Sequence, residues 1–470
     1  MEIQTGALII VLAYMVGMMI VGYVVGKINI KGSADYLVAG RRMGLFMVAF
    51  SLSANNIGGG STTGLAQKAF GAWGVSAIWY VLAASLAMIP LAYFAPKLRK
   101  TMAVTIPEVV GRRFGKLSSN FTAVLSVLSL FCLTSSQIGA SGAVINALIP
   151  TIPLNVCLLL AGFVTIFYTT FGGMIADQVS DLIQFGIILV GLAIATPIVL
   201  KHAGGWAAIS AVLPGEKLNM TQIGWASIIG YFFNYFCTFL CGPEMVSRFE
   251  TCKDEKTAVR ASFLCAILMA AMSIFPTLLG LAENGSNAMM VVTGAYAPGV
   301  ITGLISAAII CATMSSADSN LLCMSTMIIN DIYPGFGGKK KLDDKQTIFY
   351  TRLCNVIAAL IAMGISMFGV SLVAMNTFAF GIRCAGPFAA YGLGLAVPKA
   401  TKNSGMISIF TGTIAFVVWQ LLSNGGTLWF MMPVVFGSLV SVITFYAVNL
   451  IEWKRGVPAA PSAYAVEEAK

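Results

Sequence analysis

Apolar runs long enough to cross a lipid bilayer recur along this chain, and they limit what it can fold into. A helix needs about 20 mainly apolar residues to cross the hydrocarbon core. We expect the first run to stay in place as a helix, because Glu2 is its only early charge and a cleaved signal begins with a basic segment. We predict thirteen spanning helices, at residues 6–27, 43–67, 72–94, 119–149, 154–171, 178–200, 221–243, 258–282, 298–328, 346–369, 371–397, 404–424 and 428–450.

The composition agrees with a membrane protein. Of the 470 residues, 58% are hydrophobic and 10% are charged, whereas soluble domains carry roughly 25% charged residues. No stretch of the sequence has the composition of a domain outside the membrane. We therefore predict an all-α, multi-pass integral membrane protein of the cell membrane, surrounded by the lipid bilayer.

The net charge of +10 does not indicate a nucleic-acid partner, because the basic residues follow the predicted topology. If the N-terminus is outside, the loops after odd-numbered helices are cytoplasmic, and they hold 24 of the 28 Lys and Arg residues. This excess follows the positive-inside rule and predicts the orientation N-out, C-in. Lys68, Lys201 and Lys217 fall outside, and Arg383 lies within a span. The cytoplasmic set is Lys27, Lys31, Arg41, Arg42, Lys97, Arg99, Lys100, Arg112, Arg113, Lys116, Arg248, Lys253, Lys256, Arg260, Lys339, Lys340, Lys341, Lys345, Arg352, Lys399, Lys402, Lys454, Arg455 and Lys470.

Residue types disfavour an enzyme and a transition-metal protein. His202 is the single histidine, it lies in a predicted loop, and no catalytic triad or HExxH pattern accompanies it. Nine of the ten cysteines lie in predicted spans, and none forms a CxxC pair. We expect the cysteines to pack as small apolar residues, and we expect no enzyme activity and no transition metal.

The stretch SLSANNIGGGSTTG, residues 51–64, should interrupt the second predicted helix. Gly disfavours helix, and Asn competes for backbone hydrogen bonds. Non-helical backbone inside a membrane is tolerated only where it lines a protein cavity. A second candidate interruption is NYFCTFLCGPE, residues 234–244, which contains a Gly-Pro pair.

The two interruptions lie five helices apart, which is the spacing of a five-plus-five inverted repeat. Breaks at matched positions of such repeats mark transport sites. We therefore expect an extra N-terminal helix and loop (1–41), a first repeat (42–220), a second repeat (221–400), and two extra C-terminal helices with a cytoplasmic tail (401–470).

The sequence CATMSSADSN, residues 311–320, places polar groups inside a predicted span. Asp318 flanks a helical face of small and hydroxyl residues. Such a face suits a hard cation, which prefers several oxygen ligands, and Asp181 could supply a second anionic oxygen. The alternative is that small residues simply allow close helix packing. The residues of this face are Ala312, Ser315, Ser316 and Ser319.

Five motifs make the chain resemble the sodium:solute symporter family, whose members carry glucose, proline, pantothenate or sialic acid with sodium. The resemblance implies a leucine-transporter-like core, with one helix before it and two after it. The motifs are YLVAGRRMG (36–44), TIPEVVGRRFG (105–115), FGGMIADQVSDLIQ (171–184), GPEMVSRFETCKDEKTAVRA (242–261) and ATMSSADSNLLCMSTMIINDIY (312–333).

The resemblance also implies where sodium binds. Carbonyl oxygens and two hydroxyls form the family's first sodium site, and the matching residues are Ala54, Ile57, Ala312, Ser315 and Ser316. Some members bind a second cation, and the matching positions are Asp181, Ser315, Asp318 and Ser319. The chain departs from that pattern at Asp318, where those members have a hydroxyl. Two carboxylates could tighten a second sodium, share a proton or pair with Arg383.

The residues that line the substrate cavity in the family are harder to match to positions in this sequence. The hydroxyl-binding glutamate and lysine of the sugar carriers are absent, and so is the carboxylate-binding arginine of the sialic acid carriers. Arg383 could bind a substrate carboxylate or pair with Asp181 or Asp318, and we favour the structural pair. By position, the other lining residues would be Asn56, Gly58, Ser61, Trp79, Tyr80, Gln137, Tyr235 and Thr238.

Together these features predict a sodium-coupled symporter that imports a small polar organic solute by alternating access. Two alternatives stay open: proton coupling on the same fold, motivated by Asp181 and Asp318, and a transporter-like solute sensor. The sequence names neither the solute nor the number of sodium ions, and it does not indicate an oligomeric state.

Overall fold

The computed structural model describes residues 5–282, 299–335, 342–368, 372–424, 428–429 and 431–464. Lys339, Lys340, Lys341 and Lys470 of the predicted cytoplasmic set lie outside the described residues, as do residues 298, 369, 371 and 430 near the ends of predicted spans. The α-helices are α1 (Thr5–Asn29), α2 (Ser33–Val38), α3 (Leu45–Asn56), α4 (Leu65–Phe70), α5 (Trp79–Thr101), α6 (Ile106–Phe114), α7 (Lys116–Leu148), α8 (Leu154–His202), α9 (Gly205–Val212), α10 (Trp225–Leu240), α11 (Pro243–Thr251), α12 (Glu255–Leu281), α14 (Gly299–Met327), α15 (Tyr333–Gly335), α16 (Asp344–Met367), α17 (Leu372–Cys384), α18 (Gly394–Ala396), α19 (Lys402–Leu422) and α20 (Pro433–Lys454).

Nine helices among the described residues are long and apolar enough to cross a membrane, so the protein is multi-pass. Several predicted spans are built from shorter pieces. The span 43–67 is divided among α3, the π-helix η2 (Gly60–Gly64) and α4, and the span 371–397 among α17, the π-helix η6 (Ala389–Leu393) and α18. The total of thirteen spans, their orientation and the inverted repeats stay predictions.

Helix α8 joins two predicted spans, 154–171 and 178–200, in 49 residues. It bends at Gly173, whose φ of 57° lies in the left-handed region that favours glycine. A Cβ atom at this position would also lie 2.7 Å from the ring of Tyr36. The bend therefore requires glycine, and it falls between the two apolar runs.

Helix α1 packs closely against the first half of α8. A Cβ atom on Gly26 would lie 2.3 Å from the carbonyl oxygen of Phe171, and one on Gly22 would lie 2.6 Å from the Cβ of Tyr168. Two small residues four positions apart let the backbones of membrane helices approach in this way. The α1–α8 contact therefore fixes the position of Phe171, two residues before the bend.

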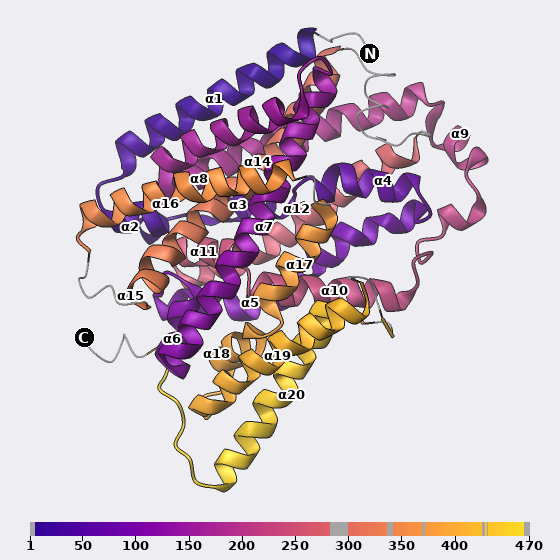
Figure 1. The fold of residues 1–470 in the computed structure, drawn as a ribbon. Coiled ribbons are helices and arrows are strands. Elements are labelled where there is room, and N and C mark those ends of the chain that lie inside the picture. Colours follow the sequence, from indigo (N-terminus) through magenta and orange to yellow (C-terminus); the bar gives the residue numbers. More distant parts are fainter. Residues whose placement is uncertain are drawn as a thin grey trace.

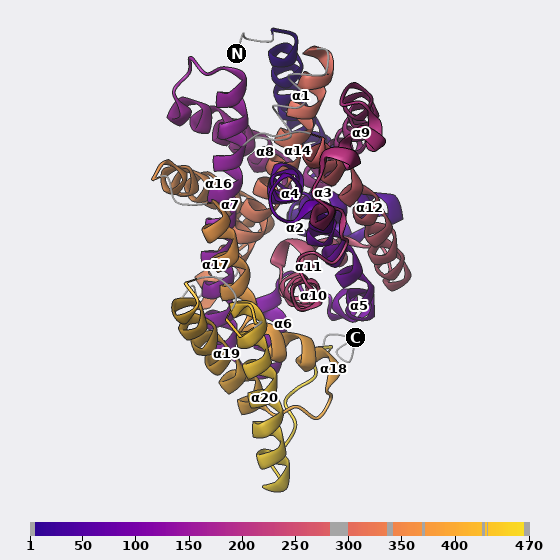
Figure 2. The same ribbon diagram turned by 90° about the vertical axis from the view of Figure 1, so that its right-hand side faces the viewer.

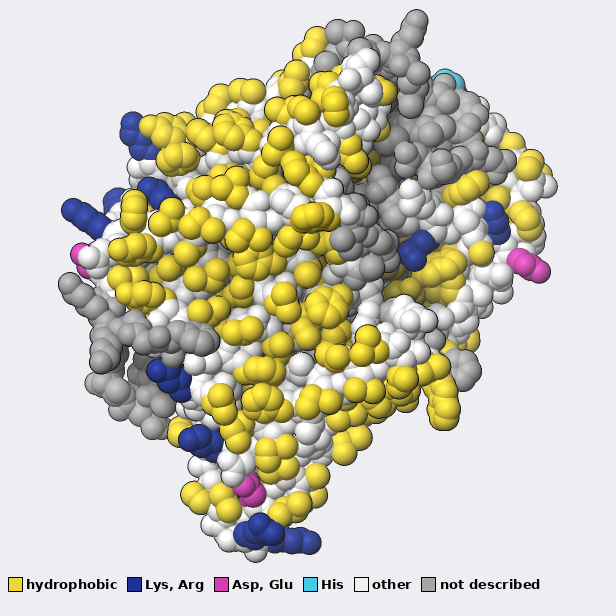
Figure 3. Space-filling view, in the orientation of Figure 1, with side chains coloured by type: hydrophobic (Ala, Val, Ile, Leu, Met, Phe, Trp, Pro, Cys, Tyr) yellow, Lys and Arg dark blue, Asp and Glu magenta, His cyan; other side chains and the backbone are white. Residues whose placement is uncertain are grey.

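Helix α14 is the centre of the fold. The most apolar 18-residue window of its spanning segment, Gly303–Ile332, is entirely buried, and α1, α3, α7, α8, α11 and α16 surround the helix. Helices α19 and α20 pack against each other and project from the lower end of the molecule (Figures 1 and 2). Hydrophobic side chains cover most of the face in Figure 3, while most of its Lys and Arg side chains lie at the left edge and lower tip and a few lie toward the right. This distribution fits a body surrounded by lipid with its charges at the rim.

Candidate functional site

Both predicted interruptions are present in the structure. Helix α3 ends at Asn56, Ile57 leaves the helical region with φ −100° and ψ 81°, and η2 begins at Gly60. Helix α10 ends at Leu240, and α11 begins at Pro243 after the extended residue Gly242. Proline suits the first helical position because its missing N–H would have no partner there.

The glycines after Ile57 let the backbone lie against its neighbours. A Cβ atom on Gly58 would lie 3.3 Å from the amide of Gln137 and 3.4 Å from the hydroxyl oxygen of Ser316. A Cβ atom on Gly60 would lie 3.2 Å from the hydroxyl oxygen of Tyr80. Larger residues here would push these polar side chains away from the interrupted segment.

Hydroxyls of α14 contact the end of α3. Ser315 Oγ lies 3.1 Å from the carbonyl oxygen of Ala54 and 3.2 Å from that of Ala312. Ser316 Oγ lies 3.0 Å from the carbonyl oxygen of Asn55 and 3.3 Å from that of Ala312. These contacts bring together four of the five residues expected at the first sodium site.

The fifth residue, Ile57, is adjacent to this group. Its backbone N–H donates to the carbonyl oxygen of Ala54 at 3.2 Å, and its side chain is buried. The group thus offers carbonyl and hydroxyl oxygens, which are the ligand types that hard cations prefer. None of the five residues in this group carries a charge. The group therefore suits a monovalent cation that is bound weakly.

A cavity of ≈ 70 Å³ lies beside the interrupted helix. Six of the residues expected at a substrate site line it: Asn56, Gly58, Ser61, Tyr80, Gln137 and Tyr235. Trp79 and Thr238 are not among the described lining residues. The indole of Trp79 donates to the carbonyl oxygen of Met220 at 2.9 Å, and Thr238 is buried.

The cavity also has a wall of amides that we did not predict. Asn55, Asn320 and Asn376 line it together with Glu244. Asn320 directly follows the motif SSADS, so helical spacing from Ser316 was the signal that could have identified it. The remaining lining residues are Gly60, Leu133, Phe239, Ser316 and Phe380.

Arg383 pairs with Glu244, so the predicted pairing with Asp181 or Asp318 was wrong. Both Nη atoms of Arg383 donate to the Glu244 carboxylate at 2.6 Å, in a bidentate pair. The Arg383 side chain is fully buried, whereas Glu244 reaches the cavity. The guanidinium therefore lies behind the cavity wall, and Glu244 separates it from the cavity. The sequence placed Glu244 in a loop, which is why it was missed.

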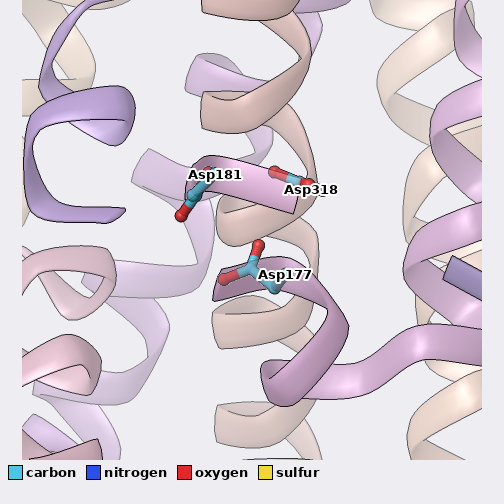
Figure 4. Close-up of side chains that lie close together, drawn as sticks. All are labelled: Asp177, Asp181 and Asp318. Carbon is cyan, nitrogen blue, oxygen red and sulfur yellow. The ribbon is translucent and has the colours of Figure 1, made fainter. Parts of the chain in front are cut away.

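Three carboxylates form a buried cluster between α8 and α14 (Figure 4). One oxygen from each of Asp177, Asp181 and Asp318 lies within 4.8 Å of the others. Ser319 Oγ lies 3.0 Å from Asp177 Oδ1 and 3.4 Å from Asp318 Oδ1. The residues expected at a second cation site are therefore together, and Asp177, which we did not assign to it, joins them.

Arg248 is the counter-ion of this cluster, and counting it with the cytoplasmic loops was wrong. Its Nη2 atom lies 2.7 Å from Asp177 Oδ2 and 3.0 Å from Asp181 Oδ2, and it also donates to Ser319. Its Nε atom donates to Ser51 at 3.1 Å. The side chain is fully buried on α11, which follows the interruption at Gly242.

The cluster has more negative than positive charge. If all three carboxylates are ionised, Arg248 leaves a formal charge of −2 among the described residues. Asp181 Oδ1 and Asp318 Oδ2 are buried and have no hydrogen-bond partner in the part of the chain that the structure describes. Buried charges need a partner, so this residue set has the capacity to bind a further cation.

The sequence matches one protein family. A profile of the sodium:solute symporter family matches residues 36–412. A sodium/proline symporter of Staphylococcus aureus (strain bovine RF122 / ET3-1) is 25% identical over 482 residues, which cover 95% of this chain and 93% of that protein. Another Staphylococcus aureus sodium/proline symporter is 26% identical over 457 residues, with 90% and 88% covered.

Solved structures share the fold. A Na+-coupled sialic acid symporter in a substrate-bound outward-open state superposes with a TM-score of 0.83 at 20% identity, over 97% of this chain and 99% of that one. Mhp1, a nucleobase-cation-symport-1 family transporter, superposes in a closed conformation with a TM-score of 0.61 at 16% identity, over 93% and 98%. The family match covers most of the sequence and both curated relatives span nearly its full length, so this chain belongs to the sodium:solute symporter family.

Proposed function

We propose that this protein imports a small polar organic solute together with sodium, by alternating access. The observation that carries the proposal is the contact of Ser315 and Ser316 on α14 with carbonyl oxygens at the interrupted end of α3. The contact joins two helices through oxygen atoms alone, and an amide-lined cavity lies beside it.

In this proposal, the first sodium binds among Ala54, Ile57, Ala312, Ser315 and Ser316. The hydroxyls, which now donate to carbonyl oxygens, turn their lone pairs to the cation, which holds α3 and α14 at one separation. A ligand shifts a conformational equilibrium only by its different affinity for the two states. Sodium therefore favours the state in which α3 and α14 are close.

The solute binds in the cavity beside Asn56 and Ser61. Ser316 and Asn55 belong both to the cavity wall and to the α3–α14 contact, so solute and sodium would share part of their surroundings. Amide groups of Asn and Gln both donate and accept hydrogen bonds. This wall suits a polar solute of few atoms, and L-proline is the first to test because the curated relatives are named sodium/proline symporters.

The sodium gradient is sufficient for uphill uptake. One positive charge that crosses 100 mV releases about 2.3 kcal/mol, and a tenfold concentration gradient adds about 1.4 kcal/mol. One sodium could thus concentrate a neutral solute roughly 500-fold, and two sodium ions roughly 10⁵-fold. A second sodium would bind at Asp181, Asp318 and Ser319, next to Asp177.

The excess carboxylates favour one alternative, in which a proton is the coupling ion. Uptake of radiolabelled L-proline and of a panel of neutral, anionic and cationic solutes into proteoliposomes separates the two proposals. We expect uptake under an inward sodium gradient at equal pH. Uptake driven by a pH gradient without sodium would show that protons, and not sodium, are the coupling ions. Binding of a solute without uptake would indicate a sensor.

Ser316→Ala provides the site test. We expect it to raise the sodium concentration that gives half-maximal uptake. Ser408→Ala is the matched control, because Ser408 is a buried helical hydroxyl on α19 that donates to Gly405 of its own helix. An equal effect of the two substitutions would show that Ser316 acts only through packing.

A further inference from the structure

A groove of ≈ 380 Å³ opens on the surface between the C-terminal end of α1, the segment of α8 at Phe171 and the first turns of α16. Two cations, Lys27 and Arg352, line it together with the rings of Tyr23 and Phe171. Lys27 is in the last turn of α1, and Arg352 is two turns into α16. Both belong to the set that the positive-inside rule assigns to the cytoplasmic side.

The guanidinium of Arg352 is held in place by two aromatic rings. Its Cζ atom lies 5.5 Å from the ring centre of Tyr36 and 5.8 Å from that of Phe171. Nη2 donates to the carbonyl oxygen of Phe171 at 3.4 Å, and Nε is buried without a hydrogen-bond partner among the described residues. Arg352 is therefore held in place by Tyr36 and Phe171, and it makes no ion pair with a carboxylate among the described residues.

No carboxylate lines the groove within the described ranges, and the nearby acids are engaged elsewhere. Asp35 pairs with Arg42 at 3.3 Å, and Asp344 accepts a hydrogen bond from Ser33 at 2.7 Å. The groove thus has a formal charge of +2. The Lys27 ammonium is held above the ring of Tyr23, at 5.8 Å, and has no ion pair in the described structure.

Exposed apolar side chains directly follow two of the groove-lining residues, Lys27 and Ile348, in the sequence. Ile28 is 67% exposed and Phe349 is 60% exposed, on the helices that carry the two cations. In a membrane these side chains face acyl chains, while the long Lys and Arg side chains reach toward the headgroup level. A ligand that fits this combination has a phosphate and a hydrocarbon tail.

We propose that this groove binds the phosphate of an anionic phospholipid from the cytoplasmic leaflet, with its acyl chain along α1 and α16. Basic pockets between transmembrane helices bind such headgroups, and each Lys or Arg near the surface adds about 1 kcal/mol. The lipid would contact Phe171, two residues before the bend at Gly173, and so support the α1–α8 packing.

The test is native mass spectrometry of the full chain in detergent, titrated with phosphatidylglycerol and with phosphatidylcholine of the same acyl chains. We expect one phosphatidylglycerol to bind several-fold more tightly than phosphatidylcholine. Lys27→Gln and Arg352→Gln should each weaken phosphatidylglycerol about fivefold, and the double variant about 25-fold. Phosphatidylcholine, whose choline cation offsets the charge of its phosphate, should lose much less affinity.

Lys345→Gln is the matched control, because Lys345 is an exposed basic residue on the same helix, outside the groove. Arg352→Lys keeps the charge and should retain most of the preference, which distinguishes lost binding from lost folding. Equal affinity for the two lipids, or an unchanged preference in the double variant, would overturn the proposal. Inorganic phosphate at the same concentration should not displace the lipid, and displacement would identify a soluble-anion site instead.

Discussion

Arg248 and Arg383 are both fully buried and both depend on α11, yet their surroundings differ in charge. Arg383 meets one carboxylate, Glu244, in a bidentate pair that closes one side of the cavity. Arg248 lies beside a cluster of three carboxylates and cannot neutralise them all. A balanced pair is complete by itself, whereas the unbalanced cluster leaves negative charge that a cation could neutralise, as proposed above. The comparison separates a wall of the cavity from a candidate ion site, although both consist of buried ionic groups.

The largest effect should come from Arg248→Met. Removing one partner of a buried ion pair costs about 3–5 kcal/mol, because the remaining charges stay buried and unpaired. We expect a large fall in the apparent Tm in detergent, or no folded protein. Arg112→Met is the control, because Arg112 and its partner Glu108 on α6 are partly exposed and such pairs contribute about 1 kcal/mol or less. Equal losses would show that the cluster does not depend on Arg248.

Arg383→Met should cost somewhat less, roughly 3 kcal/mol, because Glu244 borders the cavity and water can reach it. The double variant Arg383→Met/Glu244→Gln should recover part of the loss, since no charge is then left alone. A double-mutant cycle on the apparent Tm measures this coupling. Additive effects would show that the pair contributes nothing beyond packing.

Asp318→Ser tests the comparison at the carboxylate cluster. The substitution removes one of the three carboxylates and so lowers the excess negative charge of the cluster. The loss of one nearby carboxylate should weaken a cation bound there at least about tenfold. The measurement is the rise in Tm with added sodium chloride, compared with choline chloride. Stability without sodium should increase, because like charges then repel less. An unchanged response to sodium would show that the excess charge holds no cation.

Ser315→Ala tests the uncharged group on the same helix. The substitution removes one hydroxyl ligand, worth about 1.5 kcal/mol at a charged group, so sodium affinity should fall about tenfold. Sodium titration of solute uptake measures the change. If Ser315→Ala and Asp318→Ser produced the same shift and their combination produced no more, the two groups would form one site.

The smallest effect concerns Asp254, an exposed carboxylate that caps α12 outside the spanning segment. Its carboxylate accepts the Thr257 N–H at 2.7 Å, and this hydrogen bond holds the pKa of Asp254 below its usual value. A pKa that is lower in the folded state gives stability at higher pH, and this stability is lost as pH falls through the folded-state pKa. Asp254→Asn should therefore flatten the fall in Tm between about pH 5 and pH 3. A curve parallel to that of the unmodified protein would contradict the assignment.

The sequence predicted the structural features that depend on residues close together in the chain. Glycines and a Gly-Pro pair interrupt helices by local backbone preference, so Ile57 and Gly242 fall where composition placed them. The helical face of Ser315 and Ser316 follows from spacing alone. These features need no knowledge of which helices are neighbours.

Charge pairing was not predictable in the same way. Arg248 follows a Gly-Pro interruption and precedes Lys253 and Lys256, so its position resembles that of a cytoplasmic loop charge. Its partners are more than 60 residues away on α8, and only the tertiary fold brings them together. Asn376 reaches the cavity for the same reason, from a helix whose orientation the sequence does not specify.

Helix α11 carries Glu244 at the cavity and Arg248 at the carboxylate cluster, one turn apart, and Arg248 Nη1 donates to the carbonyl oxygen of Glu244 at 3.0 Å. A shift of this nine-residue helix changes both places at once. If sodium occupies the cluster and a solute occupies the cavity, as proposed above, such a shared element makes the affinity of each ligand depend on the occupancy of the other. Thermodynamic linkage makes that dependence reciprocal: the factor by which sodium tightens the solute must equal the factor by which the solute tightens sodium.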